Sequence, residues 1–249
     1  MDRLIYTAVS GANRSLNQQM IHANNLANTN NLANANTEGF RADLERANSQ
    51  QVAGYGYNSR YQVNSANGGI NMANGALKET GRELDIGIRG DGLIALREGR
   101  REVYTRNGHI DIDEMGNLSV NGKPLLGEAG PIQLPPFSEV AIGDDGTISV
   151  IPENGDLEAA MDVDRIKLVD VPANRLRKND DGLLVSTRRT EPRSESVQVA
   201  SEHLETSNVS AINEMVATVS LSRQFEAQIK MMKAAETLAQ AGNRLIRGS

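Results

Sequence analysis

The sequence contains no cysteine and no tryptophan, and aromatic residues make up only 3% of its 249 residues. The absence of cysteine excludes disulfides and thiolate metal sites. No stretch approaches the ~18 uninterrupted apolar residues that a membrane-spanning helix needs, so we expect no membrane span. With 39% hydrophobic residues the chain can build a core, but that core must consist mainly of aliphatic side chains.

Positive charge is also scarce, because the formal net charge is −6 and no run of Lys and Arg is longer than two residues. A surface that neutralises phosphates is therefore not expected, and neither is nucleic acid binding. The first residues, Met1–Tyr6, lack a basic segment followed by an apolar one. We therefore expect no cleaved signal peptide.

The longest regular pattern lies at the C-terminus, where residues 210–241 contain neither Gly nor Pro. Apolar residues recur there at spacings of three and four, which predicts a helix from about Asn208 to Arg247 with a single apolar stripe. Such a helix is ~60 Å long at 1.5 Å per residue. A stripe of this length requires an equally long partner.

Residues 2–28 supply the candidate partner, because Ile5, Val9, Ala12 and Leu16 follow a four-three-four rhythm typical of a heptad seam. We therefore predict that the two terminal helices pair as a coiled coil. Both stripes, together with one apolar residue after the first helix, form the predicted assembly interface: Ile5, Val9, Leu16, Met20, Leu26, Phe40, Val209, Ile212, Val216, Val219, Phe225, Ile229, Met232 and Leu238.

An Asn-rich segment follows the first helix, because Asn-Asn-Leu-Ala-Asn at residues 24–28 returns at residues 30–34. Asn favours helix ends and turns, so the helix is expected to end here. The repeat is interpreted as a tandem duplication tolerated near a helix terminus, with an extension of the interface as the alternative. Residues 41–77 are polar and rich in Gly, Asn and Ser, which favours an extended arm with loose hairpins.

Residues 81–190 show an all-β pattern of short apolar runs separated by turn dipeptides. Asn107-Gly108 predicts a hairpin between residues 103–106 and 110–112. The fold class is therefore α+β, with long terminal helices, extended arms and a central barrel-like or sandwich-like domain. The predicted parts are residues 1–36, 37–80, 81–192 and 193–249.

The sequence carries no recognisable catalytic, cofactor-binding or metal-binding constellation. His22, His109 and His203 have no acidic or cysteine partner at ligand spacing. The two Asp-Asp-Gly runs, at residues 144–146 and 180–182, are interpreted as turns because they lack the pattern of a calcium loop. We therefore expect neither an enzyme nor a cofactor.

Motifs at both ends of the chain resemble those of the flagellar basal-body rod protein family, which belongs to the axial rod and hook proteins. Leu204-Glu205-Thr206-Ser207-Asn208 resembles its C-terminal signature, and Asn-Asn-Leu-Ala-Asn with Asn36-Thr37-Glu38-Gly39-Phe40-Arg41 resembles its N-terminal one. Tyr104-Thr105-Arg106-Asn107-Gly108 and Gly127-Glu128-Ala129-Gly130-Pro131-Ile132 are similar to the proximal rod members. The family carries one Asn-Asn-Leu-Ala-Asn element, whereas this chain carries two.

The resemblance implies a structural axial subunit of the bacterial flagellar basal body. Such a subunit polymerises through its paired terminal helices with itself and with other rod proteins, and its β domain decorates the outside of a torque-transmitting rod across the periplasm. It also implies export by the flagellar type III apparatus without a cleaved signal. Because the stripes are narrow, we expect the chain ends to be mobile before assembly and helical after it.

Three alternatives remain open from the sequence. The chain is also compatible with a distal rod or hook-type axial protein. A helix-stalked enzyme acting on the cell wall would require convergent acids in residues 81–190. A two-helix-plus-β binding module that never polymerises is the third.

Overall fold

The computed structural model describes residues 2–26, 36–51, 61–153 and 160–247, and these residues divide into two compact units. Unit 1 consists of residues 1–31, 43–68 and 209–249, and unit 2 consists of residues 32–42 and 69–208. The repeated Asn-rich segment falls largely in residues 27–35, which lie outside the described residues.

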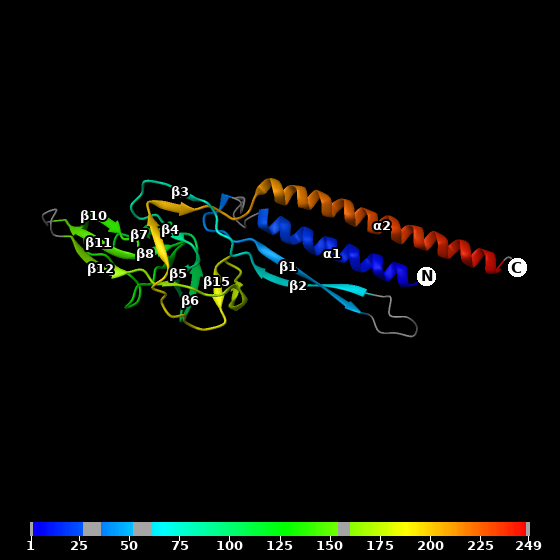
Figure 1. Cartoon of the computed structure of the whole chain (residues 1–249), viewed down its shortest axis with the longest axis horizontal. Coiled ribbons are helices and arrows are strands. Elements are labelled where there is room, and N and C mark those ends of the chain that lie inside the picture. The colour runs from blue at the N-terminus through cyan, green and yellow to red at the C-terminus, as the bar shows by residue number, and fades with distance from the viewer. Residues whose placement is uncertain (1, 27–35, 52–60, 154–159, 248–249) are drawn as a thin grey trace. The chain divides into compact units, whose positions relative to one another are not determined.

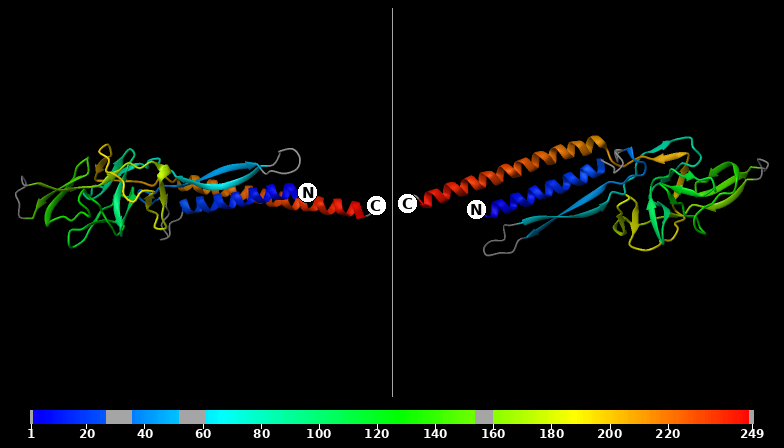
Figure 2. Two further views of the ribbon diagram at one scale, coloured as in Figure 1. Left: turned by 90° about the horizontal axis from the view of Figure 1, so that it is seen from below. Right: turned by 180° about the vertical axis from the view of Figure 1, so that it is seen from behind.

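Unit 1 is built on two helices, α1 (Asp2–Leu26) and α2 (Ala211–Arg247). They lie side by side (Figures 1 and 2). Both predicted helices are therefore present, and α2 begins three residues later than expected. Ser210 precedes α2, and its Oγ accepts from the Asn213 amide at 3.5 Å, the long limit of a capping bond. Strands β1 (Asp43–Gln51) and β2 (Tyr61–Ile70) pair in a two-stranded sheet, and β1 contacts α1.

The predicted coiled-coil pairing of the terminal helices is wrong. The apolar residues of α2 do not form one stripe, because the step of two residues from Val219 to Leu221 turns the helix by ~200°. The residues up to Val219 and those from Leu221 onward consequently lie on opposite faces. Val219 is 53% exposed and Leu221 is 7% exposed, so the face of α2 that packs on α1 begins at Leu221, although Leu238 further along is 68% exposed.

Helix α1 departs from the predicted seam in a similar way. Its buried residues include Ala8 and Ala12, whereas Val9, Leu16 and Met20 are exposed. These larger side chains lie roughly 100° around the helix from Ala8, at 100° per residue. Helix α1 therefore contributes small residues to the contact with α2, and much of the predicted seam is left in solvent.

Unit 2 is a β unit, as predicted, assembled from several small sheets. Its main sheet has the order β13–β5–β6–β15–β14, and a second sheet has the order β10–β11–β12. The strands of these two sheets are β5 (Leu93–Glu98), β6 (Arg101–Thr105), β10 (Phe137–Ile142), β11 (Thr147–Pro152), β12 (Met161–Arg165), β13 (Leu168–Val169), β14 (Leu176–Lys178) and β15 (Leu184–Ser186). A 3-10 turn, η2 (Ala173–Arg175), precedes β14.

The remaining strands of unit 2 join residues far apart in the sequence. Strand β16 pairs antiparallel with β4, and β17 pairs antiparallel with β3. Strands β7, β8 and β9 form a three-stranded sheet. Their bounds are β3 (Leu77–Glu79), β4 (Ile86–Arg89), β7 (Asp111–Ile112), β8 (Leu118–Val120), β9 (Lys123–Pro124), β16 (Gln198–Ser201) and β17 (His203–Glu205).

The core of unit 2 is aliphatic, as the composition requires. One cluster of fully buried side chains includes Ile86, Ile94, Leu96 and Ile148, and a second surrounds the buried Tyr104. Burying each such aliphatic side chain contributes roughly 1.5–3 kcal/mol. The β unit thus has a core of its own.

Turn predictions in unit 2 were partly right. Asp144 and Asp145 lie in the turn of the β10–β11 hairpin, where the Asp145 carboxylate accepts from the Thr147 amide at 3.0 Å. The hairpin predicted at Asn107-Gly108 is wrong, because β6 pairs with β5 and β15 while β7 pairs with β8. Gly108 serves close approach instead, since a Cβ there would lie 1.6 Å from the Ile86 carbonyl oxygen.

Candidate assembly surface and buried ion cluster

The contact between α1 and α2 is a close approach of small side chains. Ala8, Ala12 and Ser15 are buried on α1, and a Cβ added at Gly11 would lie 2.9 Å from the Gln228 side chain of α2. A Gly at this position costs ~1 kcal/mol of helix propensity relative to Ala, and the close approach is the reason it is tolerated. The helix pair therefore holds together with little apolar burial.

The opposite face of α2 carries large apolar side chains in solvent. Ile212, Met215, Val216 and Val219 are 74%, 54%, 64% and 53% exposed. Further along α2, Met231, Leu238 and Leu245 are also exposed. Their spacing of three, four and seven places each group along one line on the helix. We call Ile212, Met215, Val216 and Val219 the outer stripe.

Helix α1 adds to the exposed apolar surface of unit 1. Its exposed apolar residues are Tyr6, Val9, Leu16 and Met20. Soluble monomers rarely expose contiguous apolar patches larger than a few hundred Å², and larger patches mark interaction sites. Unit 1 therefore presents apolar side chains that its own helix pair does not cover.

The fourteen residues predicted as an assembly interface are divided among three environments. Seven of them are exposed, namely Val9, Leu16, Met20, Ile212, Val216, Val219 and Leu238. Six are half-buried, namely Ile5, Leu26, Phe40, Phe225, Ile229 and Met232. Val209 is buried. Phe40 belongs to unit 2 and is thus separate from the helical set.

Polar side chains at the end of α1 bind it to β1 and to α2 within unit 1. The buried Asn25 amide donates to the Asp43 carbonyl oxygen at 3.2 Å and accepts from the Asp43 amide at 2.8 Å. His22 Nδ1 lies 2.5 Å from a Glu214 carboxylate oxygen of α2. Asn25 of the first Asn-Asn-Leu-Ala-Asn motif therefore joins α1 to β1 through hydrogen bonds. His22 joins α1 to α2 through Glu214.

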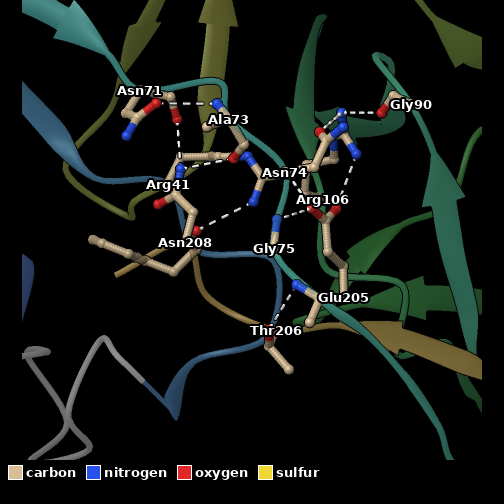
Figure 3. Close-up of polar contacts among 12 residues, drawn as sticks. Arg41, Asn71, Ala73, Asn74, Gly75, Gly90, Arg106, Glu205, Thr206 and Asn208 are labelled. Carbon is tan, nitrogen blue, oxygen red and sulfur yellow. Dashed lines mark hydrogen bonds and ion pairs between the residues drawn. The ribbon is translucent and has the colours of Figure 1, made fainter. Parts of the chain in front are cut away.

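Unit 2 contains a buried ion cluster of two arginines and one glutamate (Figure 3). Arg41 Nη2 lies 2.6 Å from one carboxylate oxygen of Glu205, and Arg106 Nη1 lies 2.9 Å from the other. The three side chains are 1%, 0% and 0% exposed for Arg41, Arg106 and Glu205. Charged residues are almost never fully buried unless they are paired in this way.

Neighbouring groups add hydrogen bonds to the cluster, although Nε of Arg41 and Nε of Arg106 are buried without a hydrogen-bond partner among the described residues. The Gly75 amide donates to Glu205 Oε1 at 2.7 Å. Arg106 Nη2 donates to the Gly90 carbonyl oxygen at 2.7 Å and to Asn74 at 3.1 Å. Burial away from water lowers the pKa of Arg106, and the charge of Glu205 opposes that shift. With two positive groups and one negative group, the cluster depends on this single carboxylate.

Asn208 ties together the points where the chain enters and leaves unit 2. Its side-chain oxygen accepts from the Ala42 amide at 2.9 Å, and its amide donates to the carbonyl oxygens of Asn71 and Ala73 at 2.8 and 2.9 Å. Among the described residues, unit 2 has boundaries at Ala42, Gly69 and Asn208. All three boundary segments therefore meet beside the Arg41–Glu205–Arg106 cluster, as Figure 3 shows.

The residues of this cluster were not predicted as a site, although they lie within the motifs that carry the family resemblance. Arg41 ends the N-terminal motif, Arg106 lies in Tyr-Thr-Arg-Asn-Gly, and Glu205 and Asn208 lie in the C-terminal motif. One signal was available, because a charged residue beside buried apolar ones in three separate motifs suggests a shared ion pair. The convergence gives these motifs a common structural role.

Comparison with known proteins places the chain in a family. Residues 200–245 match the family model described as the flagellar basal body rod FlgEFG protein C-terminal region. Over its whole length the chain is 35% identical to the flagellar basal-body rod protein FlgF of Escherichia coli K12, with 99% of each chain covered. The chain belongs to the FlgF family of flagellar basal-body rod proteins. The same identity and coverage are found with FlgF of Salmonella typhimurium LT2.

A related rod protein shows how far the similarity extends. The chain is 26% identical to the flagellar basal-body rod protein FlgG of Bacillus subtilis 168 over 263 aligned positions, covering 96% of this chain. The FlgF proteins of Escherichia coli and Salmonella typhimurium are thus more similar to the chain than this FlgG protein is, at comparable coverage. The matched C-terminal region contains both Glu205 and the outer stripe of α2.

Proposed function

We propose that this chain is a structural subunit of the flagellar basal-body rod, in its proximal part, and that it assembles through the apolar side chains exposed on its terminal helices. It acts without catalysis: the rod relatives are structural proteins, and no role for an enzyme follows from family membership. Its neighbours are other copies of itself and other rod proteins.

The observation that carries this proposal is the outer stripe. Ile212 and Val216 are 74% and 64% exposed, on a face of α2 turned away from α1. Burying such side chains contributes roughly 1.5–3 kcal/mol each when they are fully covered. An identical outer face on every copy suits a repeating head-to-tail interface, which generates helical filaments when it does not close.

The proposal also covers where the chain is located and how it is exported. The rod crosses the periplasm and transmits torque, and the subunit reaches it through the flagellar type III export apparatus without a cleaved signal peptide. In the described part of the chain, no helix is both long and apolar enough to cross a membrane.

A substitution in the outer stripe tests the proposal. Val216→Asp places a charge in the proposed interface while leaving the face of α2 that contacts α1 untouched. We expect loss of rod assembly and of motility, with unchanged folding of unit 2. The matched control is Gln224→Asp, which adds the same side chain at an exposed polar position of the same helix.

Assembly is measured by isolating basal bodies from cells that carry each variant, and folding by the circular dichroism and thermal unfolding of purified protein. Normal motility and normal rods with Val216→Asp would contradict the proposed interface.

A further inference from the structure

Unit 2 carries a concentrated basic surface, although the chain as a whole has a net charge of −6. Two adjoining cavities of about 460 and 350 Å³ share Arg100 and Arg101 in their walls. Arg97 lines the first cavity, and Arg188 and Arg189 line the second. All five arginines are exposed. We call these five residues the basic surface.

This surface is positively charged because the carboxylates that face its arginines form ion pairs with lysines instead. Across the β5–β6 pair, Arg97 lies opposite Glu102 and Arg101 lies opposite Glu98. However, Lys167 Nζ lies 2.5 Å from Glu102. Lys123 Nζ likewise lies 2.5 Å from Glu98. The nearest carboxylates are therefore occupied by lysines from other strands and loops.

As a result, several guanidinium groups have no carboxylate of their own. Among the described residues, Arg97, Arg100 and Arg101 form no ion pair, and Arg189 donates only to the Arg100 carbonyl oxygen. Arg188 lies 3.8 Å from Glu191, which is a distant contact. A planar guanidinium binds carboxylates through two parallel hydrogen bonds, so this surface suits a partner rich in carboxylates.

The same unit carries a surface of the opposite charge. In the described part of the β10–β12 sheet and its connections, residues 137–153 and 160–165, there are six acidic side chains and one basic side chain. Glu139, Asp144, Glu153 and Asp162 are exposed there. The single basic residue, Arg165, is paired with Asp145 at 2.5 Å. We call the described residues 137–153 and 160–165 the acidic sheet.

The two surfaces do not neutralise each other within one molecule. Figure 1 shows β10, β11 and β12 at one end of the β unit and β15 toward the other. Among the described residues, no ion pair joins any arginine of the basic surface to the acidic sheet. Complementary surfaces at separate places on one molecule meet only between copies, in a head-to-tail contact.

We infer that the basic surface binds the acidic sheet of a second copy of this chain, as a second, electrostatic contact between subunits. The inference rests on the proposed function only in that a rod holds copies next to one another. It involves unit 2 alone and none of the apolar residues of the helices.

Charge reversal with complementation tests this inference on the full chain. The basic-surface variant is Arg100→Glu/Arg101→Glu, and the acidic-sheet variant is Glu139→Lys/Glu153→Lys. The control, Lys78→Glu/Lys233→Glu, changes the net charge as much as the first variant but at exposed positions elsewhere. Self-association is measured by sedimentation velocity in ~20 mM and ~500 mM NaCl, since salt screens contacts between exposed charges.

We expect wild-type protein to associate more strongly at low salt than at high salt, where only the apolar contact of the helices remains. The basic-surface variant should weaken association at low salt by tenfold or more, and the control should leave it within twofold of wild type. Mixing the two reversed variants should restore association, because each supplies the surface that the other lacks. Restoration also shows that both variants are folded.

Three results would overturn the inference. The first is wild-type protein that does not associate at low salt, or a basic-surface variant that associates as wild type does. The second is a mixture that does not recover. The third is arginine-dependent binding to phosphatidylglycerol vesicles or to an oligonucleotide without self-association, which would assign the surface to another partner. These results do not depend on the outcome of the Val216→Asp test. That test concerns an apolar contact, which salt does not weaken, whereas the contact tested here is electrostatic and is weakened by salt.

Discussion

The buried ion cluster gives the sharpest prediction about stability. Glu205→Gln keeps the shape of the side chain but removes the only negative charge between Arg41 and Arg106, whose side chains are 1% and 0% exposed. Removing one partner of a buried pair costs roughly 3–5 kcal/mol, because the remaining charge is left buried and unpaired. Because two arginines lose their partner here, we expect a loss of unfolding free energy at the upper end of that range, ~5 kcal/mol.

That loss is large relative to the stability of a domain, which is typically ~5–15 kcal/mol. The control is Glu128→Gln, which removes the same charge from an exposed carboxylate that pairs with the half-buried Arg193 at 3.0 Å. A pair with one partner in solvent is close to a surface salt bridge, which contributes about 0–1 kcal/mol. Urea and calorimetric unfolding of the full chain measure both variants, with separate transitions assigned to the two units.

We expect the Glu205→Gln variant to lower the stability of unit 2 by several kcal/mol more than the control does. Equal effects of the two substitutions would refute the assignment of Glu205 as the anion on which the cluster depends.

Three further predictions follow from particular contacts. Gly108→Ala places a Cβ 1.6 Å from the Ile86 carbonyl oxygen and should destabilise unit 2 in calorimetry, whereas Gly122→Ala, with no atom within 4 Å, should cost only backbone strain. Burial raises the pKa of Tyr104 above its ordinary value, as does its hydrogen bond to Glu102, so the unfolded chain ionises first as the pH rises. Stability should therefore fall by about 1.4 kcal/mol per pH unit above ~10, and Tyr104→Phe should abolish this contribution in alkaline unfolding experiments; an identical slope in the variant would count against the buried phenol. In the free monomer, hydrogen exchange should be fast along residues 209–245, because α1 and α2 bury few apolar side chains, and strong protection there would contradict ordering on assembly.

The sequence predicted the elements better than it predicted their contacts. Helix at both ends and β structure between them follow from local periodicity and turn residues, and both are present. The predicted helix pairing was wrong because the apolar residues up to Val219 and those from Leu221 onward do not lie on one continuous stripe. A shift of two residues within a long apolar series is enough to move half of it from the inside to the outside.

The hairpin at Asn107-Gly108 was wrong for a different reason. Asn-Gly is a strong local turn signal, and at Asn121-Gly122 it does form the turn between β8 and β9, with φ of 51° and 72°. At Gly108 the requirement is instead close packing against Ile86, a residue 22 positions away. Contacts over such separations leave no local trace in a single sequence.

The Arg41–Glu205–Arg106 cluster illustrates the same limit. Its partners are separated by 164 and 99 positions. Each residue alone is an ordinary polar residue of a motif, and only the fold shows that they share one buried site. The motifs were therefore recognisable as a family signature before their physical role was known.

Cryo-electron microscopy of isolated basal bodies that contain this chain shows whether the exposed apolar faces of the terminal helices form the rod interface. We expect Ile212, Val216 and Val219 of each subunit to be covered by a neighbouring rod subunit. Density in which these three side chains remain exposed to solvent in the assembled rod would contradict this interface.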